Sequence, residues 1–594
     1  MTGYTAPLRD MRFVLHEVVG LDEVARLPGC EEATPDLVDQ VLEEAGKFAS
    51  GVLAPLNETG DREGTRLENG VVRTPAGFAD AYQKFVAGGW NGLPFDPGHG
   101  GQGLPWLVST AVSEMWFSAN MAFGLCPLLT QGAVELLAGH GSNEQKELYL
   151  DKLTSGEWSG TMCMTEPQAG SDVGAINTRA VRDGEGWRIT GAKTFITYGD
   201  HDMAANIVHM VLARTAGAPP GIRGVSLFVV PKLIVGSDGA PGPRNDVRVV
   251  SLEHKLGINA SPTCVMAFGD SDGAAASLVG EENRGIEYMF MMMNNARLGV
   301  GLQGVAMAER AYQRAHAYAR ERRQGRRLSD GEPARLVDHA DVRRMLMTMK
   351  AQAEAMRALA CRVAADIDVA RRHADAEARD AARRRVDLLT PVVKAYCSDT
   401  GFELASLGVQ VHGGMGYIEE TGAAQHLRDA RIAMIYEGAN GIQALDLARR
   451  KLQLEDGRAM QEYLAGLGAL DHRLDAADEA LAPLRARLGE AAKALDAATR
   501  WFAATWPKDA DGAAAGATDY LRLFGLTACG EMMAEAALKA SERVRANDAD
   551  ADFYRAKMAT ARFFAERILP LAPALLGPIT AGAGTLTGLG DTID

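Results

Sequence analysis

A change in hydrophobic periodicity along the chain limits most strongly what it can fold into. Between residues 161 and 280, short runs rich in β-branched and aromatic residues are bounded by Gly, Asp and Pro, as in GWRITGAKTFIT and GVSLFVVPKLIV. Runs of this kind predict strands. On either side, apolar residues recur at i, i+3, i+4 and i+7, as in RLGVGLQGVAMAERAYQRAHAYARERR, which predicts helices. Helices and strands segregated in this way favour separate domains over alternating βαβ units.

The chain has 594 residues, too many for a single hydrophobic core, so we predict an α+β multidomain fold. The expected segments are an N-terminal extension (1–40), an N-terminal helical domain (41–160), an all-β domain (161–280), a helical domain (281–450) and a C-terminal helical extension (451–594). Within the last segment, PKDADGAAAGATD, from Pro507 to Asp519, is expected to be a loop.

Charge and composition disfavour several classes of protein. A net charge of −15 argues against a nucleic-acid partner, because neutralising phosphates requires clustered Lys and Arg. The N-terminus does not read as a secretory signal, and no apolar run is expected to approach the roughly 18–20 residues of a membrane span. Seven scattered cysteines without a CxxC pair predict reduced thiols rather than disulfides or a metal site. We therefore expect a cytoplasmic protein with no metal and no membrane contact.

The glycine-rich GHGGQG, from Gly98 to Gly103, formally matches the dinucleotide-binding pattern GxGxxG. It follows Pro97 without a predicted strand and is followed by Leu-Pro-Trp, so a plain loop is the better interpretation. The chain also lacks a Walker loop, HExxH and GxSxG. Phosphoryl transfer, zinc proteolysis and serine hydrolysis therefore have no support.

Two further segments each permit two interpretations. In TMCMTEPQAGSDVGAINTRA (residues 161–180), Thr165, Gly170 and Ser171 offer hydroxyls and accessible backbone to an anion or a polar ring. A capped turn between helix and strand explains the same residues, and the residues alone favour that turn. Glu437, in Tyr-Glu-Gly ahead of a predicted helix, either complements the N-terminal dipole of that helix or acts as a general base.

Four motifs in order carry a family resemblance: MTEPQAGSD, GAKTFIT, QVHGGMGY and IYEGANGIQ, within roughly residues 40–450. With them the chain resembles the acyl-CoA dehydrogenase flavoenzymes. The N-terminal YTAPLRDMRFVLHEV and the helical tail after Lys451 resemble the larger subgroup that includes 3-methylmercaptopropionyl-CoA dehydrogenase. The resemblance implies an N-terminal α-helical domain, a central β-barrel and a C-terminal four-helix bundle, plus an extra C-terminal helical domain. It also implies FAD held between barrel and bundle, and a homodimer or a dimer of dimers.

The resemblance assigns roles to individual residues. Those implied to line or contact the flavin ring are Met162, Met164, Thr165, Phe195 and Thr197. Gly170 and Ser171 are implied to lie near the pyrophosphate or the entering acyl-CoA. From the partner subunit, the segment with Gln410, Gly413, Gly414 and Gly416 is implied to reach the adenosine end of FAD. Arg322 and Gly325 match a second partner motif that here lacks its usual Phe.

Substrate contacts are implied for Ser171, Arg297, Tyr436 and Gly438, although a solvated helix position also explains Arg297. Glu437 matches the base that removes the α-proton. Some relatives carry this base on the helix that begins near Arg297, but ARLGVGLQGVAMA has no acidic residue. Glu437 therefore has no rival in this sequence.

The implied reaction introduces a trans-2 double bond into an acyl-CoA, with the β-hydride passing to flavin N5. Candidate substrates are 3-(methylthio)propanoyl-CoA and short- or medium-chain straight acyl-CoA, and electron-transferring flavoprotein is the expected acceptor. One alternative is an acyl-CoA oxidase that uses O2. A DNA-associated alkylation-response flavoprotein is a weaker alternative, because acidic residues outnumber basic ones after Lys451.

Overall fold

The computed structural model describes residues 3–236 and 238–587, so the outermost ends of the predicted N- and C-terminal segments lie outside it. The chain forms two compact units. The first, here called the bundle unit, comprises Met1–Gly46, Pro105–Glu114 and Val300–Asp594. The second, the barrel unit, comprises Lys47–Leu104 and Met115–Gly299. Each unit therefore combines segments that are far apart in the sequence.

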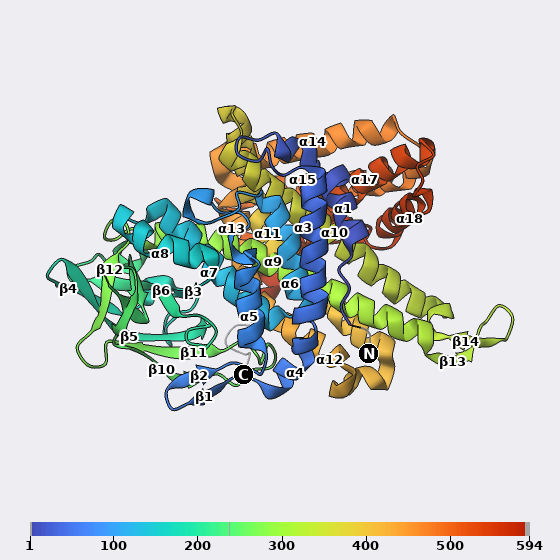
Figure 1. The fold of residues 1–594 in the computed structure, drawn as a ribbon. Helices are drawn as coiled ribbons and strands as arrows, with labels where there is room; N and C mark the ends of the chain where they lie inside the picture. The colour runs from blue at the N-terminus through green and yellow to red at the C-terminus, as the bar shows by residue number, and fades with distance from the viewer. Residues whose placement is uncertain (1–2, 237, 588–594) are drawn as a thin grey trace. The chain divides into compact units, whose positions relative to one another are not determined.

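The strands of the barrel unit form one eight-stranded sheet, part of which closes into a ring; they are drawn mainly in teal and green in Figure 1. The strands concerned are β3 (Trp158–Cys163), β4 (Arg179–Asp183), β5 (Gly186–Thr197), β6 (Asn206–Thr215), β7 (Ser226–Pro231), β10 (Val247–Leu252), β11 (Thr263–Phe268) and β12 (Ala274–Leu278). The order β5-β12-β7-β6 is closed by β4, which pairs with both β5 and β6. The predicted β-barrel is confirmed, and its interior is packed with apolar side chains such as Trp187, Phe228 and Phe268.

The barrel unit also contains helices. They are α4 (Pro55–Glu63), α5 (Phe78–Ala87), α7 (Met121–His140) and α8 (Asn143–Ser155). Helix α7 contacts β3 closely, because a side chain at Gly160 would lie 2.5 Å from Ala133. The expectation that no apolar run has membrane-spanning length was wrong, since α7 is long and apolar enough by composition. Of its most apolar window 94% is buried inside the protein, which is typical of a core helix.

The bundle unit is helical, and several of its helices are long. Its helices include α3 (Pro35–Phe48), α6 (Trp106–Ala119), α9 (Gly285–Glu321), α10 (Ala340–Arg372), α11 (Ala376–His412), α12 (Ala423–Ala430) and α13 (Asn440–Arg449), with α3, α6 and α9 each continuing into the barrel unit. The backbones of α9 and α11 approach closely, because a side chain at Gly304 would lie 2.1 Å from the Cys397 carbonyl oxygen. The glycines of RLGVGLQG therefore serve helix packing, and the predicted bundle is confirmed.

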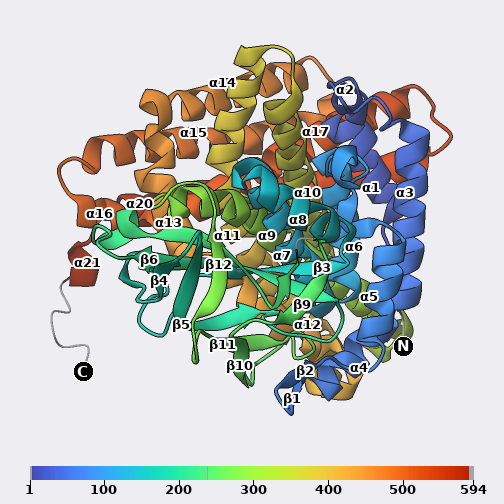
Figure 2. The same ribbon diagram turned by 60° about the vertical axis from the view of Figure 1, so that its left-hand side comes forward.

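The extra C-terminal domain is helical, as predicted. Its main helices are α14 (Arg458–Asp475), α15 (Ala482–Thr505), α17 (Ala517–Arg545) and α18 (Ala551–Arg567), and α14, α15 and α17 lie side by side in Figure 2. The loop expected from Pro507 to Asp519 was wrong for most of its length, because α16 (Ala510–Ala515) and the start of α17 occupy it. Alanine favours helix here, and Asp509 caps α16 by accepting a hydrogen bond from the Gly512 amide at 2.8 Å.

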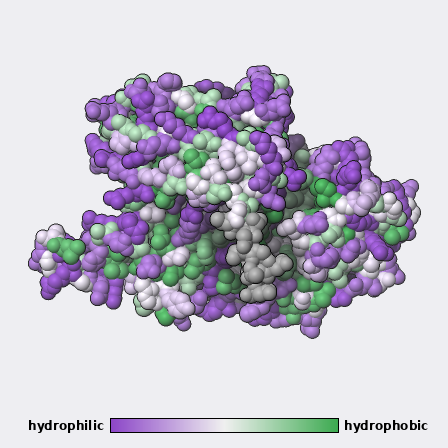
Figure 3. Space-filling view, turned by 180° about the vertical axis from the view of Figure 1, so that it is seen from behind, coloured by the Kyte–Doolittle hydropathy of each residue, from purple (hydrophilic) through white to green (hydrophobic). Residues whose placement is uncertain are grey.

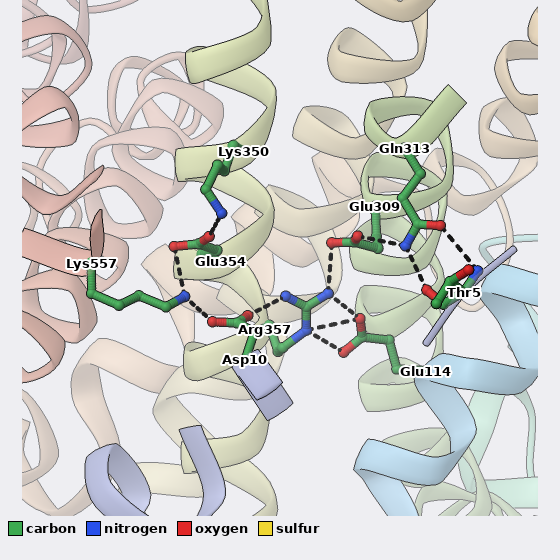
Figure 4. A network of polar contacts seen from close by, with 9 residues as sticks. All are labelled: Thr5, Asp10, Glu114, Glu309, Gln313, Lys350, Glu354, Arg357 and Lys557. Carbon is green, nitrogen blue, oxygen red and sulfur yellow. Dashed lines mark hydrogen bonds and ion pairs between the residues drawn. The ribbon is translucent and has the colours of Figure 1, made fainter. Parts of the chain in front are cut away.

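A buried ion network links the N-terminal segment, the bundle and the C-terminal domain (Figure 4). Asp10 comes from α1 (Leu8–Arg12), Arg357 from the middle of α10 and Lys557 from α18. Arg357 Nη1 lies 2.5 Å from Asp10 Oδ2, and Asp10 also pairs with Lys557. Glu114 of α6 and Glu309 of α9 pair with the same guanidinium at 2.5 and 2.9 Å. Charged groups buried in this way are compatible with folding only because they are paired.

Candidate active site

The segment implied to face the flavin begins on the barrel. Met162 lies in β3, so the first residues of the segment form a strand. The chain then turns, and the amide and carbonyl of Glu166 exchange hydrogen bonds with those of Ala169 at 3.1 and 2.9 Å. The Thr165 carbonyl accepts a hydrogen bond from the Thr194 amide at 2.9 Å. These bonds hold Met164 and Thr165 beside β5, the strand that carries Phe195 and Thr197.

A buried ion pair organises this turn, and sequence reasoning missed it. Lys193 is fully buried, and its Nζ lies 2.8 Å from Glu166 Oε1 and 3.1 Å from the Met164 carbonyl oxygen. The Glu166 carboxylate also accepts hydrogen bonds from the amides of Asn177 and Thr178 at 2.7 and 3.1 Å. Burial alone would raise the pKa of Glu166, but the Lys193 ammonium and these hydrogen bonds lower it to about 2. The signal in the sequence was a lysine at an inward-facing position of a strand.

Phe195 projects outward from a β-bulge. Lys193 pairs with Met266 and Ile196 with Cys264, so Thr194 and Phe195 together oppose one residue of β11. Phe195 has φ of +59°, a conformation that non-glycine residues rarely adopt, and its side chain is 63% exposed. Strain of this kind clusters at functional sites. The bulge therefore presents an exposed aromatic ring directly beside the segment that carries Thr165.

Gly170 and Ser171 lie on the surface after the turn. Both are exposed, and a side chain placed at Gly170 would meet no atom within 4 Å. The backbone here is therefore open to a ligand. Arg297, on the part of α9 that belongs to the barrel unit, is buried rather than solvated and donates a hydrogen bond to Asn294 at 3.3 Å. The interpretation of Arg297 as a solvated helix residue was wrong.

In the bundle unit, Glu437 lies in a tight turn between two helical segments. The turn follows a short 3-10 helix, Arg431–Met434, and precedes α13. Glu437 has φ of +58° and Gly438 has φ of +85°, so two successive residues are left-handed. The N-cap of α13 is Ala439, without a side-chain cap hydrogen bond, and its first turn contains no acidic residue. A capping role for the Glu437 side chain therefore finds no support in the structure.

Polar side chains that the sequence reasoning did not single out surround this turn. The Tyr436 hydroxyl donates to Oε1 of Gln303, a buried residue of α9. Gln443 Nε2 lies 3.4 Å from the Glu437 carbonyl oxygen. Burial and the neighbouring Glu437 charge raise the pKa of Tyr436, so its hydroxyl stays protonated at neutral pH. The Lys394 ammonium group, on α11, donates a hydrogen bond to the Gly438 carbonyl oxygen.

The residues implied to reach a partner subunit lie at the C-terminal ends of two long helices, α9 and α11. Gln410 lies in the last turn of α11, and the exposed Gly413 and Gly414 follow this helix. Side chains at these two glycines would meet no atom within 4 Å. Arg322 directly follows α9 and is exposed. It precedes a hairpin of β13 (Arg323–Arg326) and β14 (Pro333–Arg335), seen in Figure 3 as a mostly hydrophilic projection at the left edge. Leu328 at the tip of this hairpin is fully exposed.

Metal and thiol chemistry find no support within residues 3–236 and 238–587. These residues contain no group of three His, Cys, Asp or Glu side chains that could hold a metal ion. All seven cysteines are buried free thiols, and burial raises the pKa of Cys163 and Cys264 to about 12. The thiols are therefore packing residues.

Family models match nearly the whole chain. They are described as acyl-CoA dehydrogenase N-terminal domain (residues 36–157), middle domain (161–271) and C-terminal domain (283–452), followed by acetyl-CoA dehydrogenase C-terminal like (459–589). The chain belongs to the acyl-CoA dehydrogenase family. It is an acyl-CoA dehydrogenase, a flavoprotein oxidoreductase of the class whose fold and motifs it carries.

Relatives that match over nearly their whole length support the same family assignment. The chain is 48% identical to 3-methylmercaptopropionyl-CoA dehydrogenase of Ruegeria pomeroyi, over 95% of this chain and 96% of that protein. It is 33% identical to a butyryl-CoA dehydrogenase of Syntrophomonas wolfei, over 96% and 95%. An acyl-CoA dehydrogenase from Bacillus anthracis, solved in complex with FAD, has the same fold, with a TM-score of 0.74 and 21% identity over 92% and 88% of the two chains. The extra C-terminal domain is thus shared with relatives of full length.

Proposed function

We propose that this chain is an FAD-dependent acyl-CoA dehydrogenase in which Glu437 removes the α-proton of a short acyl thioester. The observation that carries the proposal is the left-handed Glu437–Gly438 turn, held between two helical segments by buried polar side chains. A strained carboxylate-bearing turn of this kind needs a reason beyond stability. An acid–base role in the family reaction supplies that reason.

The residues present fit FAD. The exposed ring of Phe195 offers a face for stacking against a flat heteroaromatic ring, and the adjacent segment offers the Thr165 hydroxyl. The open backbone at Gly170, and at Gly413 and Gly414 from a partner subunit, has room for phosphate or sugar groups. When bound, FAD supplies the hydride acceptor for the β-carbon. Met162, Met164, Thr197, Ser171, Arg322 and Gln410 complete the proposed cofactor-binding set.

The base must be stronger than an ordinary carboxylate. An unperturbed glutamate has a pKa of about 4.3, far below that of a thioester α-proton. Substrate binding excludes water from Glu437 and raises the basicity of its carboxylate. The Glu437 backbone N–H donates to the thioester oxygen, where negative charge develops as the proton leaves. The Tyr436 side chain flanks the thioester, Gly438 leaves a path to the backbone, and Arg297 assists in binding the CoA portion.

We propose a substrate with a short acyl chain, either 3-(methylthio)propanoyl-CoA or a straight-chain acyl-CoA. The full-length relatives named above support this choice, since one is a 3-methylmercaptopropionyl-CoA dehydrogenase and the other a butyryl-CoA dehydrogenase. The proposal includes electron-transferring flavoprotein as the electron acceptor and a cytoplasmic homodimer or dimer of dimers as the working form.

Anaerobic titration of the flavoprotein with acyl-CoA tests the base. Wild-type protein is expected to lose its oxidised flavin absorbance, whereas Glu437→Gln keeps its FAD and is not bleached. Glu185→Gln, the same change at an exposed carboxylate in the β4–β5 turn, is the matched control and is expected to behave as wild type. Bleaching of Glu437→Gln at the wild-type rate would refute the assignment.

A panel of acyl-CoA esters of increasing length, including the thioether substrate, tests the substrate proposal. The highest kcat/KM is expected for 3-(methylthio)propanoyl-CoA or butanoyl-CoA. A maximum at long chains would contradict the short-chain proposal. The peroxide yield under air distinguishes a dehydrogenase from an oxidase, and stoichiometric peroxide during turnover would favour the oxidase.

A further inference from the structure

The backbone around Glu437 adopts a conformation that its own sequence does not favour. Glu437 and Gly438 are both left-handed, with φ of +58° and +85°. The left-handed region is unfavourable for a non-glycine residue, because its Cβ comes too close to the following carbonyl oxygen. Such a conformation persists only where surrounding contacts impose it. The contacts that impose it therefore decide where the Glu437 carboxylate and amide point.

Lys394, on α11, makes the most direct of these contacts. It is fully buried, and its Nζ lies 2.8 Å from the Gly438 carbonyl oxygen and 2.7 Å from Asn440 Oδ1. Hydrogen bonds from an ammonium group are roughly twice as strong as neutral ones. The bond to Gly438 fixes the plane of the peptide that follows the left-handed pair.

Asn440 links the same turn to α11 through further hydrogen bonds. Its Nδ2 lies 2.6 Å from Asp399 Oδ1, 3.0 Å from Ser398 Oγ and 3.3 Å from the Ala395 carbonyl oxygen. The amide of Asn440 is therefore bonded on its oxygen side to Lys394 and on its nitrogen side to the next turn of α11. The end of the Glu437 turn is thus fastened to about one and a half turns of a rigid helix.

We propose that Lys394, with Asn440, is a positioning residue for the reaction: its ammonium group holds the Gly438 carbonyl so that Glu437 faces the α-carbon of the acyl-CoA. This inference rests on the proposed role of Glu437. In this role Lys394 acts through the backbone of the Glu437 turn. A displacement of the base by about 1 Å is sufficient to slow a reaction by about 100-fold. Substituting Lys394 should therefore slow proton removal far more than it weakens the binding of acyl-CoA or FAD.

The test compares Lys394→Met, which keeps most of the length of the side chain and removes the ammonium group, with Lys451→Met. Lys451 Nζ lies 2.9 Å from Asp387 Oδ1, so it also binds α11 but does not contact the Glu437 turn. Flavin reduction is followed by stopped flow with ordinary and α-deuterated acyl-CoA, alongside FAD content and the affinity for a non-oxidisable acyl-CoA analogue. Asn440→Ala is measured in parallel and carries the test where Lys394→Met does not fold.

Lys394→Met is expected to slow flavin reduction about 10- to 100-fold, with a larger α-deuterium isotope effect. FAD content and analogue affinity should stay within about twofold of wild type. Asn440→Ala should shift the rate in the same direction, and Lys451→Met should leave it unchanged. Wild-type reduction rates in Lys394→Met, or a loss that only follows lost FAD, would overturn the inference. Failure of the wild-type protein to be reduced by any acyl-CoA would instead refute the proposed function itself.

Discussion

Replacing Arg357 with Met perturbs the buried ion network of Figure 4 at its centre. The Arg357 side chain is 1% exposed, and its Nε lies 2.9 Å from both carboxylate oxygens of Glu114, which is also fully buried. Methionine matches the apolar stem of arginine but carries no charge. The substitution therefore removes from Glu114 the guanidinium that compensates its charge.

Breaking a buried ion pair from one side costs about 3–5 kcal/mol, because the remaining charge stays buried without compensation. The cost should depend on pH. Burial already raises the pKa of Glu114, and loss of Arg357 raises it further, so the folded protein takes up a proton. A carboxyl group with a raised folded pKa is tolerated at low pH and destabilises as pH rises. The destabilisation should therefore be greater at about pH 8 than at about pH 5.

Calorimetric unfolding at both pH values, at a fixed scan rate, measures this effect. Arg500→Met is the matched control: Arg500 pairs with Asp496 at 2.6 Å on an exposed face, so its loss should cost less than about 0.5 kcal/mol. Arg357→Met combined with Glu114→Gln should recover much of the lost stability, since no unpaired charge then remains on Glu114. The reasoning fails if Arg357→Met unfolds at the temperature of Arg500→Met at both pH values, or if the double variant is no more stable than Arg357→Met.

Three further substitutions have expected outcomes. Burial raises the pKa of Glu531 to about 7. The protonated carboxyl group is therefore fully compatible with folding below about pH 4.5, and the free energy of unfolding should fall by up to ~3 kcal/mol as the pH rises through 7. Glu531→Gln should remove this decline in a pH series of thermal unfolding. Gly416→Ala should lower the unfolding temperature, because the added carbon would lie 2.3 Å from the Val409 carbonyl oxygen, and a wild-type value would contradict this. Lys193→Met leaves Glu166 buried without its cation, so the purified protein should hold substoichiometric flavin by absorbance, and full flavin occupancy would exclude this role.

The order of domains and the family were readable from the sequence because they depend on local patterns. Strand and helix periods are set by backbone geometry within each segment, so GWRITGAKTFIT predicted β5 with the bounds that the structure has. Prediction from local patterns was wrong where tertiary packing determines the secondary structure. Alanine and aspartate between Pro507 and Asp519 resembled a loop, yet the segment is mostly helical. The apolar length of α7 was underestimated because scattered Gly, Gln and Glu interrupt a run that the core buries whole.

Some residues of the candidate site could be predicted from the sequence, and others only from the tertiary structure. The sequence by itself singled out Glu437, Thr165 and Phe195, because short motifs place them at fixed spacing. Only the tertiary structure revealed Lys394, which lies 44 residues before Gly438 in the chain and meets its carbonyl through the packing of α11 on the turn. The outward ring of Phe195 likewise depends on a bulge set by register with β11. Periodicity and motifs record local geometry, whereas contacts between distant segments exist only once the cores have packed.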